Sequence, residues 1–446
     1  MNRIVFSGIE LKAFKRALLK SAPLESAGII LARPGRGASG LRFVVVAAEI
    51  ADGVDYVKRS PTSAVLSPAF VARYLKIARD KKMSLFLVHT HPAEAWPRFS
   101  RIDDGGEKAI SPTLYARAPD GPHGSLVFGT EGFAARTFNA KGQVTGTIDR
   151  MLEVSSLIEV CQQRLQPAVS EMFDRNVRAF GREGQQLLQS LHVGIVGVGG
   201  TGSFVVEELA RLGVGQLTLI DDERVELSNL NRLIGSGSND VGRPKVDVLS
   251  EVALRASANV ELVRVPESVI KEQVARRLID CDAVFCCTDS HGSRAVINQI
   301  SYQYLVPTFD IGVRIDAEQG KVTGATSRVQ MLGPGLPCLA CYPLLSAEAV
   351  RRDLLTRDAR DQDPYIVGFH EPQPAVVSIN GAASSSAVTM FLTAATGLPS
   401  GARHLVGRPL EGTVRAAIGT PRPDCVVCGE QNAFRRADSW PVMWQS

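Results

Sequence analysis

The sequence contains no apolar run near the ~20 residues that a membrane-spanning helix needs. Its start, MNRIVFSGIELK, lacks the apolar centre of an export signal. Neither sign of charge predominates: 50 Lys and Arg against 46 Asp and Glu leave a formal net charge of +4, and no basic run stands out. We therefore expect a cytoplasmic protein that has neither a membrane nor a nucleic-acid partner. In that compartment the eight cysteines are expected to be metal ligands rather than disulfides.

The 446 residues are too many for one ordinary hydrophobic core. The pattern of apolar and polar residues changes twice along the chain. Residues 1–145 alternate short β-rich runs with helical patterns, which predicts an α+β domain. Residues 146–173 are predicted to be a helical linker, from a pattern that continues to about residue 190. From Val193 strands and helices alternate in the βαβ rhythm of a doubly wound parallel sheet, so residues 174–446 are predicted to be a Rossmann-like α/β domain. In the first domain the predicted strands are 43–48, 84–88 and 125–128, the helices are 9–21 and 68–81, and a loop is expected at 33–40.

A metal-binding pattern lies in the first domain. His89 and His91 end an apolar run, and alternate strand positions project to one face, so both can reach one metal ion. Ser100 and Asp103 follow downstream, and Glu25 stands upstream in LESAGII. Two His and one Asp leave a zinc ion with an open fourth position, as in hydrolytic sites. The alternative is a surface His-x-His with unrelated carboxylates.

This set resembles the JAMM (JAB1/MPN/Mov34) metallopeptidases, whose pattern is a glutamate, then HxHP, then SxxD. The resemblance implies that His89, His91 and Asp103 bind a catalytic Zn²⁺. It also implies that Glu25 is the general base and that Ser100 helps to hold the oxyanion. The loop 92–99 between the second histidine and the serine is one residue longer than is usual in the family.

A nucleotide-binding pattern opens the second domain. The run 197-GVGGTG-202 follows an apolar strand and precedes an amphipathic helix, so its backbone can approach a phosphate at the helix N-terminus. Asp221 closes the next strand, where a carboxylate can meet a ribose hydroxyl. Taken alone this pattern is typical of a dinucleotide-binding dehydrogenase. The residues that follow favour ATP, because Asn229, Arg232 and Lys245 are the donors that a triphosphate needs.

Asp289, at the end of the apolar strand predicted at 283–286, completes this set as a carboxylate for magnesium. The set resembles the E1-like superfamily, which includes the ThiF and MoeB adenylyltransferases and the E1 enzymes of ubiquitin-like proteins. The resemblance implies ATP and Mg²⁺ as cofactors, and a homodimer in which Arg178 of 175-RNVR-178 reaches the ATP of the partner subunit. An ordinary surface arginine is the alternative for Arg178. The implied ATP and Mg²⁺ residues are Gly197, Gly199, Gly200, Gly202, Asp221, Asn229, Arg232, Lys245 and Asp289.

Two CxxC pairs, Cys338 with Cys341 and Cys425 with Cys428, have the spacing of a closed Cys₄ zinc site. Closed coordination predicts a structural zinc, and a redox pair is the alternative. The long separation of the two pairs is typical of the E1-like superfamily.

A cysteine is missing where many E1-like enzymes carry their thioester-forming nucleophile. Between Cys341 and Cys425 the sequence has none, although it offers His370, Glu371 and the serines 384–386. Of the other four cysteines, Cys161 falls in the predicted linker helix, and Cys281, Cys286 and Cys287 lie on or beside a strand, where they are expected to pack as small apolar residues. The acyl acceptor is therefore expected on an E2-like or other protein, on a serine of this chain, or on a rearranged cysteine.

Together these patterns predict a bifunctional enzyme of a ubiquitin-like pathway. Its second domain would adenylate the C-terminus of a ubiquitin-like protein with MgATP. Its first domain would hydrolyse (iso)peptide bonds after that C-terminus. Two alternatives are sulfur-carrier activation and processing for cofactor or amino-acid biosynthesis, and a regulatory scaffold with an inactive peptidase half.

Overall fold

The structure, a computed structural model, describes all residues except 9, 163–167, 343, 356–373 and 446. Two compact units are present: residues 1–165 with 435–441, and residues 166–434 with 442–446. The segment 435–441 therefore belongs to the first unit although it follows the second along the chain. Within the first unit, Arg435 Nη1 donates to Ser7 Oγ at 3.1 Å.

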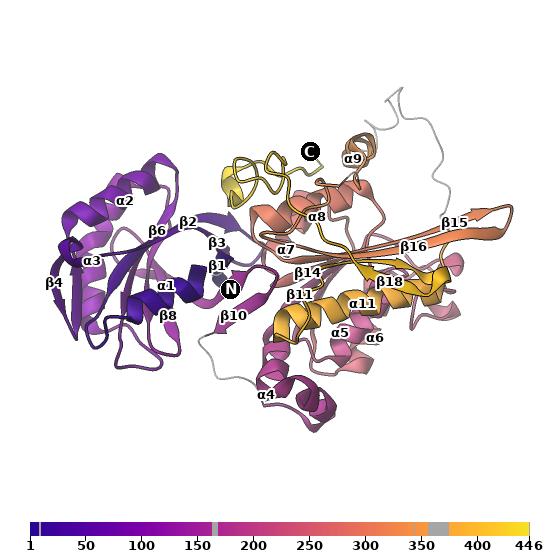
Figure 1. Cartoon of the computed structure of the whole chain (residues 1–446), viewed down its shortest axis with the longest axis horizontal. Helices are drawn as coiled ribbons and strands as arrows, with labels where there is room; N and C mark the ends of the chain where they lie inside the picture. The colour runs from indigo at the N-terminus through magenta and orange to yellow at the C-terminus, as the bar shows by residue number, and fades with distance from the viewer. Residues whose placement is uncertain (9, 163–167, 343, 356–373, 446) are drawn as a thin grey trace. The chain divides into compact units, whose positions relative to one another are not determined.

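Eight of the described strands of the first unit form one sheet in the order β1-β3-β2-β6-β7-β8-β9-β10, of which Figure 1 labels β1, β2, β3, β6, β8 and β10. The second half of β9 also pairs in parallel with β1, so the sheet closes on itself as a barrel of strands. A separate hairpin consists of β4 (Tyr56–Ser60) and β5 (Ser63–Leu66). The strands of the barrel are β1 (Asn2–Ser7), β2 (Ala27–Arg36), β3 (Leu41–Ile50), β6 (Ser84–Thr90), β7 (His123–Phe128), β8 (Phe133–Phe138), β9 (Val144–Val154) and β10 (Ile158–Gln162).

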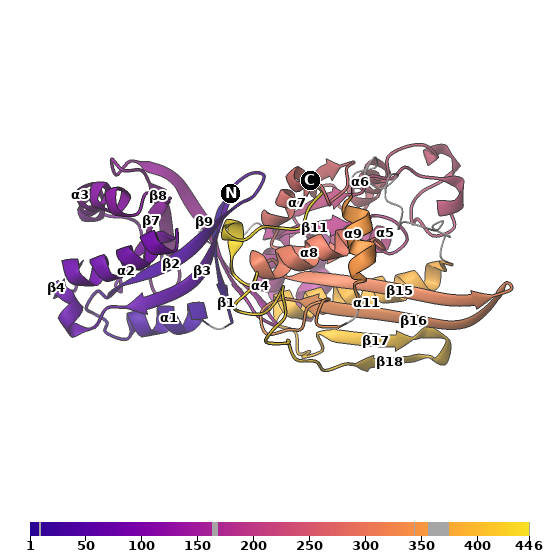
Figure 2. The same ribbon diagram turned by 90° about the horizontal axis from the view of Figure 1, so that it is seen from above.

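Three helices accompany this sheet: α1 (Glu10–Leu19), α2 (Pro68–Asp80) and α3 (Arg101–Arg117) (Figure 2). Side chains alternate along a strand, so Ile30 packs in the core cluster that contains α1, while Ile29 packs in the cluster that contains α2 and α3. On β6, Leu85 and Leu87 belong to the cluster of α2 and α3. The same alternation places His89 on the side that α3 covers.

Two expectations for the first unit are wrong. Residues 150–162, predicted to be helical, form the end of β9 and all of β10. The end of β9 is buried continuously between β1 and β10, and periodicity alone cannot tell such an apolar run from a buried helix. The loop predicted at 33–40 is shorter, because residues 33–36 still pair with β3 and a turn closes at Gly37–Gly40.

The second unit has a sheet in the order β13-β12-β11-β14-β15-β16-β17-β18. Neighbours from β13 to β15 are parallel, and those from β15 to β18 are antiparallel. The predicted Rossmann-like fold is therefore confirmed, with an antiparallel extension. The strands are β11 (His192–Val196), β12 (Gln216–Ile220), β13 (Glu261–Val265), β14 (Ala283–Cys286), β15 (Thr308–Glu318), β16 (Lys321–Leu332), β17 (His404–Arg408) and β18 (Thr413–Ala416).

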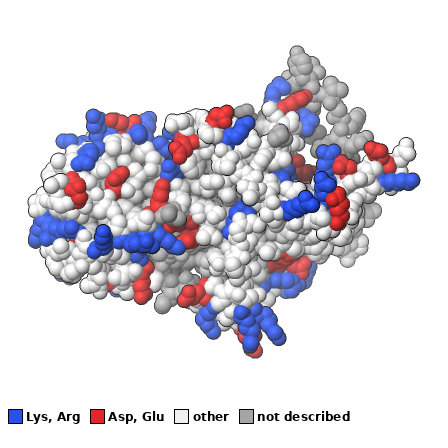
Figure 3. All heavy atoms as spheres, in the orientation of Figure 1, with Lys and Arg blue, Asp and Glu red and all other residues white. Residues whose placement is uncertain are grey.

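Helices cover both faces of this sheet: Figure 1 shows α5, α6 and α11 on one side and α7 and α8 on the other. None of the described helices is long and apolar enough to cross a bilayer. Basic and acidic side chains are interspersed on the face that Figure 3 shows. The helices are α4 (Asp174–Ser190), α5 (Gly202–Arg211), α6 (Lys245–Ala256), α7 (Glu272–Ile279), α8 (His291–Gln303), α9 (Ala347–Leu354) and α11 (Val377–Thr396).

Candidate functional site

Three side chains of the first unit converge at the C-terminal end of β6. His89 Nε2 lies 3.2 Å from His91 Nε2 and 3.1 Å from Asp103 Oδ1, and His91 Nε2 lies 3.7 Å from Asp103 Oδ2. Two nitrogens bound to one tetrahedral zinc ion are about 3.3 Å apart. Burial, followed by the charge of His89, lowers the pKa of His91 and favours the neutral imidazole that a metal requires. One ligand atom from each residue lies within 4.8 Å of the others, so the donor set fits a zinc ion.

The first turn of α3 holds Asp103 in place. Ser100 is the N-cap residue: its Oγ accepts from the Asp103 amide at 3.2 Å, and its own amide donates to Asp103 Oδ2 at 2.6 Å. Burial alone would raise the pKa of Asp103, but the hydrogen bond and charge of His89, together with Ser100, hold it below its usual range. Ser100 thus acts as a helix cap in this structure, and its oxyanion role stays a prediction.

Glu25 lies just before β2, whose first residue, Ala27, pairs with His89. Its carbonyl accepts from Arg59 Nε at 2.8 Å, which fixes the backbone here. The residue is only 7% exposed, and burial raises its pKa to about 7, while the charge of His89 acts in the opposite direction. A carboxyl group that titrates near neutrality suits a general base.

Arg136 on β8 is a further residue of this region that we did not predict. Its guanidinium lies over the Phe99 ring at 3.9 Å and donates to Asp104 at 2.6 Å and to Glu107 at 3.1 Å. It therefore ties α3 and the residue before Ser100 to the sheet. Arginine at an alternating strand position gives no local signal of such a contact.

The glycine-rich loop of the second unit joins β11 to α5, as expected. Gly197 has a φ of +83°, which favours glycine, and a Cβ atom at Gly202 would collide with the Gly197 carbonyl oxygen. Gly199 and Gly200 are only half-buried, so the loop is accessible at the N-terminus of α5. This arrangement leaves backbone groups open to a phosphate.

Asp221 follows β12 and is held by two backbone amides. Val198 donates to Oδ2 at 2.8 Å, and Glu223 donates to Oδ1 at 2.9 Å. Burial raises the pKa of Asp221 to about 6, although Lys245 lowers it. The carboxylate is thus fixed beside the loop by Val198, a loop residue.

Lys245 and Arg232 border the same loop. Lys245 is buried at the start of α6, pairs with Glu223, and places Nζ 4.0 Å from the point where a Cβ atom of Gly199 would stand. Arg232 Cδ lies 3.3 Å from the equivalent point at Gly200. Both cations can therefore face a phosphate at the loop.

The remaining predicted residues of this set lie as follows. Asn229 is buried, and its Oδ1 accepts from the Glu226 amide at 3.3 Å. Asp289 is exposed just beyond β14 and acts electrostatically on Arg294. Arg178 on α4 is exposed and bonds Asp174 at 2.8 Å. No contact brings Arg178 to the loop within the described part of one chain.

The two CxxC pairs come together. Sγ of Cys338 lies 3.4 Å from that of Cys425, and Sγ of Cys341 lies 3.3 Å from that of Cys428. Two sulfurs on a tetrahedral zinc ion are about 3.8 Å apart, so the four thiols fit one zinc ion. A hydrogen bond from Cys428 holds the pKa of Cys338 below its usual range, which favours a thiolate ligand.

A sequence profile of the ThiF family matches residues 173–417. The chain belongs to the ThiF family.

Three relatives illustrate the match of this ThiF-family protein. It is 31% identical over 238 residues to Ubiquitin-like modifier-activating enzyme 5 of Oryza sativa subsp. japonica, covering 47% of this chain and 55% of that protein. It is 33% identical over 172 residues to Molybdopterin-synthase adenylyltransferase of Escherichia coli (strain K12), covering 39% and 66%. It is 27% identical over 251 residues to SAMP-activating enzyme E1 of Haloferax volcanii, covering 56% and 84%. The matched part spans less than two thirds of the first two relatives. The JAMM resemblance of residues 1–145 stays a prediction.

Three cysteines outside the four paired ones are held in their thiol form by burial in this ThiF-family protein. Burial raises the pKa of Cys161, which lies on β10 rather than on a helix, and of Cys286 and Cys287 beside β14. Ser384 is fully buried, and its Oγ donates to carbonyl groups. His370 and Glu371 lie outside the described residues.

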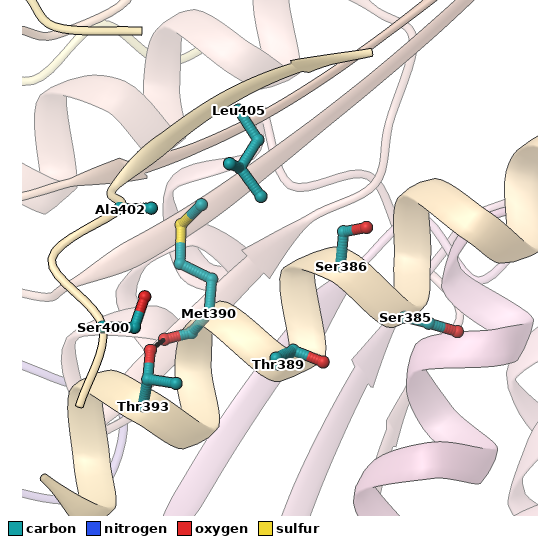
Figure 4. Close-up of a pocket in the computed structure, with 8 residues that line it drawn as sticks. All are labelled: Ser385, Ser386, Thr389, Met390, Thr393, Ser400, Ala402 and Leu405. Carbon is teal, nitrogen blue, oxygen red and sulfur yellow. Dashed lines mark hydrogen bonds between the residues drawn. The ribbon is translucent and has the colours of Figure 1, made fainter. Parts of the chain in front are cut away.

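A hollow of about 270 Å³ lies between α11 and β17 (Figure 4). Its lining is uncharged, and apart from two of the serines at 384–386 it includes none of the predicted site residues. The residues are Ser385, Ser386, Thr389, Met390, Thr393, Ser400, Ala402 and Leu405.

Proposed function

We propose that this ThiF-family protein adenylates the C-terminal carboxylate of a ubiquitin-like protein with MgATP. The observation that carries the proposal is the accessible glycine-rich loop, which has the Lys245 ammonium near Gly199 and the Arg232 side chain beside Gly200. The fixed Asp221 carboxylate beside the loop supports it. The printed names of the rice and Haloferax relatives describe activating enzymes, and that of the E. coli relative describes an adenylyltransferase.

In the proposed reaction, a carboxylate oxygen of the modifier attacks the α-phosphorus of ATP. The bond between the α-phosphorus and the bridging oxygen breaks, and pyrophosphate leaves with the bonding electron pair. Lys245 and Arg232 offset the negative charge that grows on the leaving phosphates. Asp221 accepts a hydrogen bond from the ribose, and Asp289 is the residue that would hold Mg²⁺, with Asn229 as a further phosphate donor.

The test uses the full chain, MgATP and a panel of purified ubiquitin-like and sulfur-carrier proteins. Intact-mass spectrometry should detect a partner that gains one adenylyl group at its C-terminus. No adenylate with any partner, in a chain that binds ATP, would contradict the proposed substrate class. Conversion to a thiocarboxylate only when a sulfur donor is added would favour the sulfur-carrier alternative.

A second proposed function concerns the first unit: hydrolysis of the bond that follows the modifier's C-terminus. The convergence of His89, His91 and Asp103 supports it. Zn²⁺ held there would supply Lewis acidity and lower the pKa of a water molecule. Glu25, with a pKa of about 7, is placed to accept and return a proton.

The test of this hydrolysis is a modifier extended beyond its C-terminus. Glu25→Gln should keep its zinc but lose cleavage, because only the base is removed. Cleavage at the wild-type rate would show that Glu25 is not the base. Zinc-loaded wild-type protein that cleaves no extended modifier would favour a scaffold with an inactive peptidase half.

The proposed function includes two protein partners of this chain. A second copy of the chain would receive Arg178 at its ATP; this side chain is exposed, and among the described residues it pairs only with Asp174 on its own helix. An E2-like protein would accept the acyl group on a thiol, because burial disfavours ionisation of Cys286 and Cys287.

A further inference from the structure

The N-terminal part of α11 is docked on the glycine-rich loop. Ser384 Oγ donates to the Thr201 carbonyl at 2.9 Å. A Cβ atom at Gly381 would lie 2.9 Å from the Phe204 ring, so α11 approaches α5 closely at this point. These contacts join segments about 180 residues apart and place the first turn of α11 beside the loop.

Asn380 is a second residue of α11 that meets the loop. The point where a Cβ atom of Gly200 would stand lies 2.6 Å from Asn380 Nδ2 and 3.3 Å from Arg232 Cδ. Asn380 and Arg232 therefore flank Gly200. Any side chain at position 200 would displace the Asn380 amide or the Arg232 side chain, which gives a second reason for glycine there.

The Asn380 side-chain amide has no hydrogen-bond partner among the described residues, although the residue is only 5% exposed. Its polar atoms are not among the fully buried ones that lack a partner, so part of the amide still reaches solvent. The amide is therefore free to donate to a ligand that enters beside the loop. The 20-residue helix α11 adds partial positive charge near its N-terminus, which favours an anion.

We propose that Asn380 is a further ATP-binding residue, whose Nδ2 donates to an oxygen of the β- or γ-phosphate at Gly200. The position beside Arg232, a donor to the leaving phosphates, points to that part of ATP. The inference rests on the proposed adenylation. It adds a phosphate contact from α11, which lies about 180 residues after the loop along the chain, to the phosphate contacts of Lys245 and Arg232.

The test is titration calorimetry of the full chain with MgATP and, separately, with AMP, for wild type, Asn380→Ala and Asn380→Asp. Loss of one hydrogen bond to a charged phosphate should weaken ATP binding roughly tenfold or more in Asn380→Ala. Asn380→Asp should weaken it further, because a carboxylate repels the phosphates. AMP lacks the β- and γ-phosphates, so its affinity should not change.

The matched control is Ser386→Ala on the same helix. Among the described residues, Ser386 Oγ donates only to the Ala382 carbonyl of its own helix, and the residue lines the hollow in Figure 4, so ATP binding should be unchanged. Wild-type ATP affinity in Asn380→Ala would overturn the inference alone. An equal loss of ATP and AMP would assign Asn380 a structural role and also overturn it. Wild-type protein that binds no ATP would overturn the proposed function, and the inference with it.

Discussion

Ser100 and Asp103 exchange hydrogen bonds across the first turn of α3: the Ser100 amide donates to Asp103 Oδ2 at 2.6 Å, and Ser100 Oγ accepts from the Asp103 amide at 3.2 Å. The other carboxylate oxygen is left facing His89 at 3.1 Å. The helix cap and the candidate metal site therefore share one carboxylate. A substitution that removes the N-cap of α3 should therefore change the affinity of this site for zinc.

Ser100→Ala should destabilise the first unit by about 1 kcal/mol, as loss of an N-cap does. It should also weaken zinc binding roughly tenfold, because the Oγ cap that fixes the turn carrying Asp103 is lost, although the Ser100 amide that donates to the carboxylate remains. The matched control is Ser67→Ala, which removes the N-cap of α2, where Ser67 Oγ accepts from the Phe70 amide at 3.2 Å. Chemical unfolding and zinc titration measure both effects. Equal zinc affinities in the two variants would disprove the link between cap and metal.

We expect the zinc site of the first unit to be catalytic and that of the second unit to be structural. Purified protein should carry about two zinc ions per chain. Replacing His89 and His91 with Ala should remove one zinc ion and leave the unfolding midpoint nearly unchanged. Cys338→Ser or Cys428→Ser should remove the other zinc ion and lower the unfolding midpoint of the second unit, because the free energy of zinc binding at that site contributes to the stability of the fold. Metal analysis and calorimetry check both, and equal destabilisation by the two sets would contradict the division.

Asp221 should make the unligated protein less stable as pH rises from about 4 to 6. Its pKa is about 6 in the folded chain and about 3.9 when unfolded, so the folded state holds the proton more tightly across that window. Stability from protonated Asp221 is fully present below the unfolded pKa and is lost as pH passes the folded pKa, by at most roughly 3 kcal/mol. Urea unfolding at several pH values should show a steeper fall in wild type than in Asp221→Asn, in which the raised pKa of Glu25 still contributes a fall of the same sign. Identical slopes would mean that Asp221 does not titrate in this way.

The dimer proposal predicts complementation between two inactive chains. Arg178→Ala lacks the arginine, and Asp289→Ala lacks the carboxylate at the reaction centre. Mixed dimers that pair the two variants should regain one intact ATP site and partial ATP–pyrophosphate exchange. Verified mixed dimers without any recovery would show that Arg178 does not act across the subunits.

Local sequence predicted part of the first site. Alternation along the predicted strand indicated that His89 and His91 share one face, whereas Asp103 was assigned through the resemblance to the JAMM metallopeptidases. The helix α3, whose first turn carries Asp103, was not predicted. The strand pairing that closes the barrel was not visible, because β9 pairs with β1 from the other end of the unit. Arg136 was missed for the same reason, since it acts through packing on Phe99.

In the second unit, the βαβ rhythm and the loop residues were predictable because each depends on its neighbours along the chain. The contribution of α11 was not. Asn380 meets Gly200 only after the sheet and α5 have assembled, and an Asn in an apolar helix start has no periodic signature. The Cys₄ cluster was predictable in spite of its long separation, because each CxxC pair is a local pattern.

The most direct test of the central claim is ATP–pyrophosphate exchange by the full chain in the presence of its ubiquitin-like partner. Wild type should exchange label, and Lys245→Ala should lose roughly 100-fold of the rate, because it removes a cation from the developing phosphate charge. The control is Lys271→Ala, since Lys271 also forms an ion pair, with Glu267 at 3.1 Å, but borders α7 rather than the loop. Exchange that requires the partner's free C-terminal carboxylate and Lys245, but not Lys271, is the predicted result. Exchange that is equally fast in Lys245→Ala, or that does not need the carboxylate, would contradict the account.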